Sequence, residues 1–215
     1  MPQENLNWRK SVSLLLNVLV IVLVFNACGE NKQLPFYGEK YVPLNSDTVY
    51  HTIAPFSFTN QEGNEITNTD YRDQIYIADF FFTSCPGICP VMTRELTRVQ
   101  GVIKKEALPI KILSHTVDPE QDQIKVLHDY GVKHEADFKL WDFVRGTKKQ
   151  IYEQALSYLV VAMEDTTQEI PFVHSDKLVL VDAQGRIRGM YSGIEPRDVD
   201  QLITDMKLLV TENGN

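Results

Sequence analysis

The chain has 215 residues, 43% of them hydrophobic, and a formal net charge of −8 at pH 7. This length suits one globular domain with a short tether, once an N-terminal targeting segment is set aside. The negative charge argues against a nucleic-acid-binding function, because phosphate binding requires clustered Lys and Arg. The largest basic clusters are only Lys104-Lys105 and Lys148-Lys149.

Residues 1–28 have the layout of an export signal. Residues 8–10, Trp-Arg-Lys, supply positive charge, residues 11–25 are almost wholly apolar, and Ala27 precedes Cys28. The apolar run is shorter than the ~20 residues that a spanning helix prefers. The Ala-Cys end resembles a bacterial lipoprotein box, in which Cys28 is lipidated, and the alternative is an uncleaved membrane anchor. Both place the domain on the extracytoplasmic, periplasmic face of a bacterial membrane.

Residues 29–50 are predicted to be a tether. Pro35, Gly38 and Pro43 occur there among polar residues, and no sustained hydrophobic period is visible. The globular domain is therefore predicted to span residues 51–212.

The first half of this domain is predicted to alternate strands and helices. Residues 52–67 read as a hairpin with a turn at 60–64. Residues 74–82 form a nearly continuous apolar strand, which is typical of a central strand buried on both faces. Residues 91–105 have helical spacing, and Pro90 suits the first turn of that helix.

The second half continues the alternation and adds a hairpin. Residues 110–117 are a second strand, and the helix after it opens at Asp118, a candidate N-cap, and ends near Gly131. Residues 147–159 are helical, 177–181 and 186–191 form a hairpin, and 196–209 form an amphipathic helix. This order predicts an α/β, thioredoxin-like fold with an N-terminal β-hairpin and inserted elements.

Cys85 and Cys89 lie between the buried strand and the first helix. In the first turn of a helix, positions i and i+4 project to the same side, and the N-terminus stabilises thiolates. Thiolates are what both a soft metal and disulfide exchange require. The alternative is a purely stabilising disulfide, but so short a loop limits the unfolded-state entropy that it removes.

The motif at residues 82–90, Phe-Thr-Ser-Cys-Pro-Gly-Ile-Cys-Pro, resembles the signature of the Sco/SenC family. That signature is Cys-x-x-x-Cys-Pro after an apolar strand ending in Phe-Thr. Residues 117–119, Val-Asp-Pro, are similar to a second family motif. Residues 173–175, Val-His-Ser, are similar to a third, and an apolar strand follows. The resemblance spans roughly residues 56–209.

The resemblance implies a copper site in which Cys85, Cys89 and His174 are the ligands. Two thiolates satisfy Cu(I), an imidazole adds what Cu(II) favours, and the same set could also fit zinc. Asp118 either caps the helix that follows or, as the resemblance implies, is an outer partner of the metal site. The remaining histidines match no family ligand and are interpreted as structural or exposed: His51, His115, His128 and His134.

Three functional hypotheses follow. The resemblance implies copper delivery to the dinuclear copper site of a respiratory cytochrome c oxidase, with its copper-bearing subunit, a copper donor and a thiol reductant as partners. The second hypothesis is an extracytoplasmic thiol–disulfide oxidoreductase whose Cys85 or Cys89 attacks a client disulfide. A third is a peroxide-reducing or redox-sensing domain. His174 discriminates between the first two, because dithiol exchange does not need it.

Overall fold

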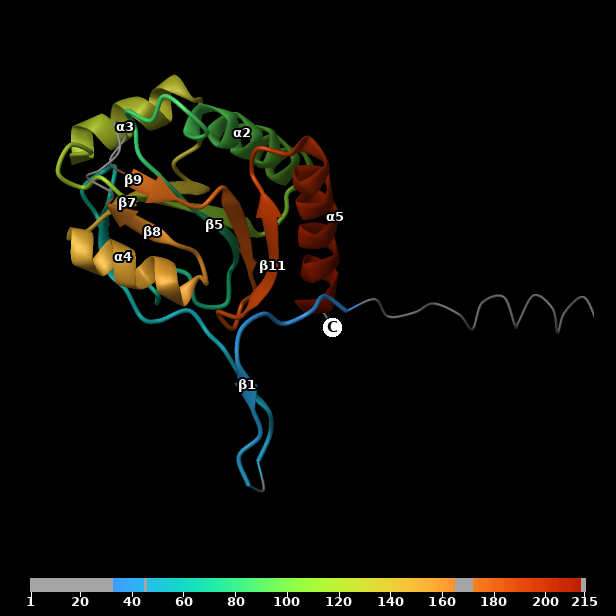
Figure 1. Ribbon diagram of the computed structural model, residues 1–215. Helices are drawn as coiled ribbons and strands as arrows, with labels where there is room; N and C mark the ends of the chain where they lie inside the picture. The colour runs from blue at the N-terminus through green and yellow to red at the C-terminus, as the bar shows by residue number, and fades with distance from the viewer. Residues whose placement is uncertain (1–32, 45, 165–171, 214–215) are drawn as a thin grey trace, which may run out of the picture. The chain divides into compact units, whose positions relative to one another are not determined.

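The computed structural model describes residues 33–44, 46–164 and 172–213 (Figure 1). Residues Leu34–Asn215 form one compact unit. The signal or anchor segment predicted at residues 1–28, with Cys28, lies outside the described residues. In the part of the chain that is described, no helix is both long and apolar enough to cross a membrane.

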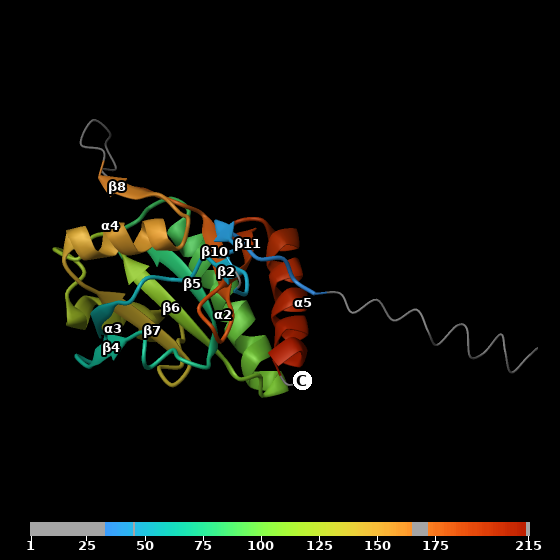
Figure 2. The same ribbon diagram turned by 90° about the horizontal axis from the view of Figure 1, so that it is seen from below.

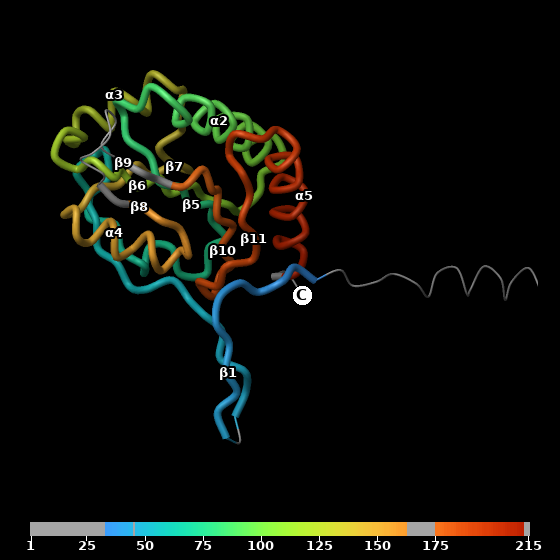
Figure 3. The backbone as a smooth tube through the Cα atoms, viewed as in Figure 1, coloured from blue at the N-terminus to red at the C-terminus, as the bar shows by residue number. Residues whose placement is uncertain are grey.

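A seven-stranded sheet forms the centre of this unit (Figure 3). Its strand order is β11-β10-β5-β6-β7-β3-β4. The middle strands run parallel, and they are β5 (Ile75–Phe81), β6 (Ile110–Thr116) and β7 (Trp141–Arg145). Antiparallel strands flank them, namely β10 (Lys177–Val181), β11 (Ile187–Ser192), β3 (Ser57–Asn60) and β4 (Glu65–Thr67). All seven residues of β5 are buried, as the apolar run predicts for a strand covered on both faces.

Helices cover both faces of the sheet (Figure 2). On one face lie α2 (Cys89–Glu106), α3 (Ile124–Lys133) and α5 (Pro196–Asn213), and α4 (Lys148–Ser157) lies on the other. Neighbouring residues of β5 show the two layers. The ring of Phe81 lies 5.2 Å from Tyr130 of α3, whereas the ring of Phe80 lies 5.7 Å from Tyr158, just after α4. Alternate side chains of the strand therefore fill two separate cores.

Strand β7 has no counterpart among the predicted elements. It is short, and Asp142 interrupts its apolar pattern. The structure supplies this buried carboxylate with two distant donors, Asn60 Nδ2 at 2.9 Å and the hydroxyl of Tyr71 at 2.8 Å. A buried polar residue is tolerated inside a strand when its polar atoms are hydrogen-bonded in this way. Asn60 and Tyr71 lie 82 and 71 positions from Asp142, so the sequence pattern does not identify them as its partners.

The compact unit begins at Leu34, whereas the sequence predicted a tether up to residue 50. Leu34 is buried, and its backbone N–H donates to Glu212 Oε1 at 2.8 Å. Strands β1 (Lys40–Tyr41) and β2 (Val49–Tyr50) then pair as a two-stranded hairpin. The segment has no local hydrophobic period because its contacts include the pairing within its own hairpin and a contact with Glu212 near the C-terminus.

A second hairpin is inserted between α4 and β10. Its strands are β8 (Ala162–Glu164) and β9 (Phe172–His174), with His174 opposite Ala162. The predicted elements did not include this hairpin. It carries the backbone of His174, one of the predicted ligands.

Candidate metal centre

The loop from β5 to α2 holds both cysteines. Cys85 lies in the loop, where its N–H donates to the carbonyl of Phe82 at 3.3 Å. Cys89 is the first residue of α2, and Pro90 follows in the first turn, as predicted. The i and i+4 interpretation required both cysteines to lie on one helical turn. Since Cys85 lies before the helix, that interpretation is wrong. Their thiols nevertheless meet, since the side chain of Cys89 hydrogen-bonds with that of Cys85.

The two thiols have unequal surroundings. Cys85 is partly exposed, whereas Cys89 is 1% exposed, and neither forms a disulfide. Burial raises the pKa of the Cys89 thiol well above its ordinary value, and the hydrogen bond with Cys85 raises it further. Burial thus outweighs the expected stabilisation of a Cys89 thiolate by the helix N-terminus. A soft cation would have to displace this proton, so metal binding at Cys89 is coupled to proton release.

The backbone of His174 lies at the same end of the sheet as the cysteines. Strand β10 is antiparallel to β5, with Val179 opposite Ala78, so the residues before Lys177 lie towards the C-terminal end of β5. Ser175 is fixed there by its N–H, which donates to the carbonyl of Val161 at 3.1 Å. The side chain of His174 is outside what the structure describes. The three-ligand set therefore stays a prediction, and the described side chains contain no group of three metal-binding residues around one point.

Asp118 does not cap a helix. Helix α3 begins at Ile124, with Gln123 at the N-cap position and no side-chain cap. Asp118 instead opens a turn in which its carbonyl accepts from the N–H of Asp122 at 2.9 Å. The N-cap interpretation is wrong, since the helix starts later than the Asp-Pro pair suggested. Burial raises the pKa of the Asp118 carboxyl. Its role as an outer partner of the metal stays a prediction.

Asp122 is a residue that the sequence interpretation missed. Its side chain is 1% exposed and accepts from the Thr83 N–H at 3.1 Å, from the Thr83 hydroxyl at 2.5 Å and from the hydroxyl of Thr116. Arg145 holds the same turn by donating to the carbonyls of Asp122 and Pro119, at 3.2 and 2.7 Å. This network fixes the start of the cysteine loop against the ends of β6 and β7. Its only sequence cue is a threonine at or just after the end of each of two apolar strands.

Asp79 is a second residue that the sequence interpretation passed over. It lies inside β5, where its carboxylate accepts from the hydroxyl of Ser114, which in turn accepts from Trp141 Nε1 at 2.8 Å. Complete burial raises the pKa of Asp79 to about 7. A charge on Asp79 would add to the elevation of the pKa of Cys89. A single acid within an apolar run is the signal that could have identified it.

The other histidines have contacts of their own. His115 is fully buried, its ring is stacked 4.6 Å from that of Phe80, and burial lowers its pKa to about 4. His51 Nε2 lies 2.7 Å from the carbonyl of Ser157. The remaining two are on or beside α3, where the ring of His134 lies 4.4 Å from Tyr130 and His128 lies beside Asp129.

We expect Asp122→Ala to lower the thermal unfolding midpoint by about 2–12 °C. Buried donors left without a partner cost about 1–3 kcal/mol, and 1 kcal/mol corresponds to about 2–4 °C in a chain of this size. Loosening the loop should also slow formation of the Cys85–Cys89 disulfide by a mild oxidant. Asp129→Ala is the matched control, since this carboxylate is exposed on α3 beside Lys125. Equal midpoints and oxidation rates for the two variants would contradict the role of Asp122.

Comparison with known proteins agrees with this geometry. The family model described as SCO1/SenC matches residues 45–211. A SCO1/SenC family lipoprotein from Bacillus anthracis str. Ames is 28% identical, with a TM-score of 0.69 over 74% of this chain and 94% of that chain. BsSco, a member of the Sco family of cytochrome c oxidase assembly proteins in which a disulfide switch was identified, is 31% identical, with a TM-score of 0.68 over 79% and 99%.

A third solved structure is Arabidopsis thaliana ScoI with copper bound. It is 25% identical, with a TM-score of 0.61 over 74% of this chain and 97% of that chain. These similarities confirm the predicted thioredoxin-like α/β fold. Because the family model covers the domain from before β2 to within α5, the chain belongs to the SCO1/SenC family.

Proposed function

We propose that this protein is a copper metallochaperone that delivers copper to the dinuclear copper site of a respiratory cytochrome c oxidase. The observation that carries the proposal is the pair of mutually hydrogen-bonded thiols, not joined as a disulfide, at the strand–helix junction. Two thiolates suit Cu(I), and a neutral imidazole from His174 supplies the nitrogen that Cu(II) favours. The copper-bound Arabidopsis relative and the oxidase-assembly role of the Sco family support this choice of metal and client.

Copper is the cargo of this site. Binding releases the protons of Cys85 and Cys89, because only thiolates are ligands. The Asp122 network keeps the loop in place while the metal is held. Delivery is an exchange of ligands, in which thiolates of the client's copper-bearing subunit replace those of this chain. Cys85 is the sulfur that an incoming thiolate reaches first, since Cys89 is buried. A separate copper donor reloads the site.

Copper titration of the chain in its reduced and oxidised forms tests the proposal. The reduced form is expected to take up a single copper ion, and with Cu(II) to show a thiolate-to-copper charge-transfer band in its absorption spectrum. The Cys85–Cys89 disulfide form should take up none, because a disulfide offers no thiolate. Reduction should restore uptake in the same sample. Undiminished uptake by the disulfide form would refute the ligand assignment.

Thiol–disulfide exchange is a second candidate, favoured by the unequal exposure of the thiols. The Cys85 thiolate would attack a client disulfide, forming a mixed disulfide and releasing one client thiolate, which takes a proton. The Cys89 thiolate would then attack the Cys85 sulfur, releasing the second client thiolate. The client gains two electrons, this chain becomes the Cys85–Cys89 disulfide, and a thiol reductant must reset it. Reduction of the client's own cysteines would prepare them for copper.

The proposed location is the extracytoplasmic face of a bacterial membrane. Either lipidated Cys28 or an uncleaved apolar segment at residues 11–25 would hold the domain there. The Bacillus anthracis lipoprotein of the same family supports this location.

A further inference from the structure

Exposed apolar side chains gather on the β1–β2 hairpin. In the described part of the chain, five of the eleven exposed large hydrophobic residues lie between positions 37 and 49. Leu44, near the tip, is 94% exposed, and Val42 and Tyr41 are 69% and 62% exposed. The hairpin extends away from the sheet and its helices (Figure 1), so its tip has no core to pack against. A cluster of this kind marks a surface that contacts something else.

The base of this hairpin is firmly attached to the domain. The N–H of Tyr37 donates to the carbonyl of Ile187 at 3.0 Å, and the N–H of Ile53 donates to that of Gly185 at 2.8 Å. Gly38 has a φ of +90°, and a Cβ there would lie 2.6 Å from that of His51. The turn into the hairpin therefore requires glycine. These contacts set the direction in which the hairpin leaves the domain.

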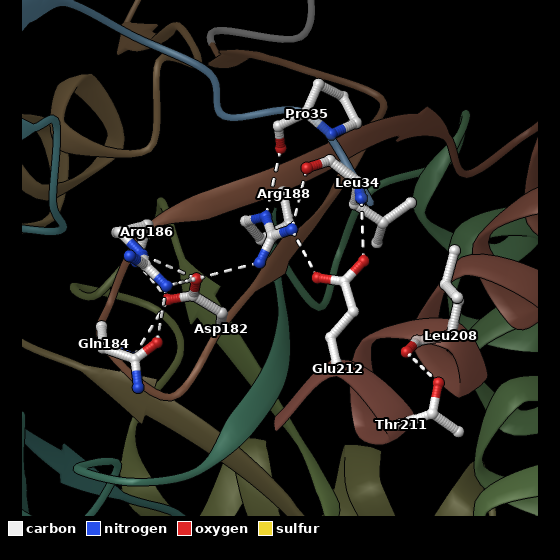
Figure 4. A network of polar contacts seen from close by, with 9 residues as sticks. All are labelled: Leu34, Pro35, Asp182, Gln184, Arg186, Arg188, Leu208, Thr211 and Glu212. Atoms are coloured by element: carbon white, nitrogen blue, oxygen red, sulfur yellow. Dashed lines mark hydrogen bonds and ion pairs between the residues drawn. The ribbon is translucent and has the colours of Figure 1, made fainter. Parts of the chain in front are cut away.

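An aromatic and ionic cluster reinforces the base, and Figure 4 shows its ionic part around Arg186 and Arg188. The ring of Phe36 lies 4.2 Å from that of Tyr50, and the guanidinium groups of Arg186 and Arg188 lie over the Phe36 ring at 4.8 and 4.3 Å. Arg188 also donates to the carbonyl of Leu34 at 2.8 Å and to Glu212 Oε2 at 2.6 Å. The hairpin thus combines a rigid base with an exposed apolar tip.

The base lies at the end of the sheet opposite the cysteines. It contacts the turn between β10 and β11, and β10 ends at Val181, opposite Tyr76 at the start of β5. The cysteine loop begins at the other end of β5. The seven residues of β5 rise about 3.3 Å each, so the two ends of the strand are about 20 Å apart.

The short chain between the anchor and the domain limits the distance between the membrane and Leu34. Leu34 is six positions after Cys28, and an extended chain over that distance spans at most about 20 Å. The tip residue Leu44 is likewise six residues beyond Gly38, and an extended strand of that length also reaches about 20 Å. A bilayer that holds the anchor is therefore within reach of the hairpin tip.

We propose that the tip of the β1–β2 hairpin, Tyr41 to Leu44, inserts into the headgroup region of the bilayer that holds the N-terminal anchor. This inference rests on the anchored location given under the proposed function. Tyr suits the membrane interface, since its ring is apolar and its hydroxyl is polar, and Val and Leu suit the layer below. The contact would turn the cysteine end of the domain away from the membrane surface, towards the client.

The small number of charged residues on the hairpin favours a lipid surface over a protein partner that binds through charge complementarity. Residues 38–50 carry only Glu39, Lys40 and Asp47 as charged residues, so the hairpin has no charged patch to complement. Insertion should therefore depend on apolar burial, and it should occur with zwitterionic lipid at any ordinary salt concentration.

The test uses the full chain, with its anchor, in phosphatidylcholine vesicles whose acyl chains are brominated to quench tryptophan. Leu44→Trp places a reporter at the tip, and Leu156→Trp, at a leucine 65% exposed on α4, is the matched control. Wild-type chain corrects for Trp8 and Trp141. The tryptophan emission that Leu44→Trp adds to that of the wild-type chain is expected to fall by about half or more in these vesicles, because interfacial aromatic rings lie at headgroup depth. The control should not be quenched.

Each alternative gives a different result. A tip that packs against a second copy would be shielded from the brominated acyl chains and would show no quenching, which would overturn the proposal. Absent or equal quenching at both positions would overturn it too. Changing Tyr41 and Val42 to Ser in the Leu44→Trp chain should reduce the quenching, and full quenching after this change would contradict the apolar mechanism. A chain that does not float with vesicles would overturn the anchoring itself, whereas copper titration reports separately on the metal site.

Discussion

His174→Ala is expected to weaken Cu(II) binding by more than about 100-fold, since loss of an outer-shell partner alone typically costs 10–100-fold in metal affinity. The physical reason is that Cu(II) favours an imidazole nitrogen that two thiolates do not replace. Oxidation of Cys85 and Cys89 to a disulfide should be largely unaffected, because that reaction involves only the two sulfurs. Anaerobic competition with a chelator of known affinity measures the first quantity, and the rate of thiol loss measures the second.

His128→Ala is the matched control for this experiment. His128 is half exposed on α3 beside Asp129, and it corresponds to no predicted ligand. Its removal should leave copper affinity unchanged. If the His174 variant retained full Cu(II) affinity, the imidazole would not be a ligand, and thiol exchange would become the favoured function. If both variants lost affinity equally, the loss would not be specific to position 174.

Arg188→Met is expected to destabilise the domain by about 3–5 kcal/mol, the usual cost of removing one partner of a buried ion pair. Arg188 is 2% exposed and lies between two carboxylates, Glu212 at 2.6 Å and Asp182 at 3.3 Å (Figure 4). It also donates to the carbonyls of Leu34 and Pro35. Methionine replaces the length of the side chain but none of these donors, so buried oxygens lose their partner.

Thermal unfolding measures this effect, and a decrease of about 6–20 °C in the midpoint corresponds to that range in a domain of this size. Arg98→Met is the matched control. Arg98 also links two elements, by pairing with Asp200 of α5 at 2.7 Å, but its side chain is 39% exposed. Such a pair contributes about 0–1 kcal/mol. Similar midpoints for the two variants would show that burial of Arg188 does not matter. A large loss should also expose Leu34 and the hairpin base to proteolysis.

The order of the elements around the cysteine motif could be predicted from the sequence. A buried strand, a short loop and a helix with proline in its first turn follow one another along the chain, so their order and the position of Cys89 depend on neighbouring residues. The strands at 75–81 and 110–116 were predictable for the same reason, since a continuous apolar run is itself the cause of burial on both faces.

The surroundings of that motif could not be predicted in the same way. Asp122 meets Thr83 across 39 positions, and Arg188 meets Leu34 across 154. Strand β7 is acceptable only because Asn60 and Tyr71 donate to Asp142. In the sequence, each of these residues looks like an ordinary polar residue, because the partner that it binds in the folded domain is far away along the chain.

The sequence by itself determined the fold class, the place of the cysteine motif between a buried strand and a helix, and the family resemblance, because each depends on patterns among residues close together in the chain. Only the tertiary structure decided that the domain begins at Leu34, that the Cys89 thiol is buried, and that an apolar hairpin projects opposite the cysteines. Burial and the direction of a hairpin depend on which distant segments fill the space around a residue, and short-range patterns do not record that.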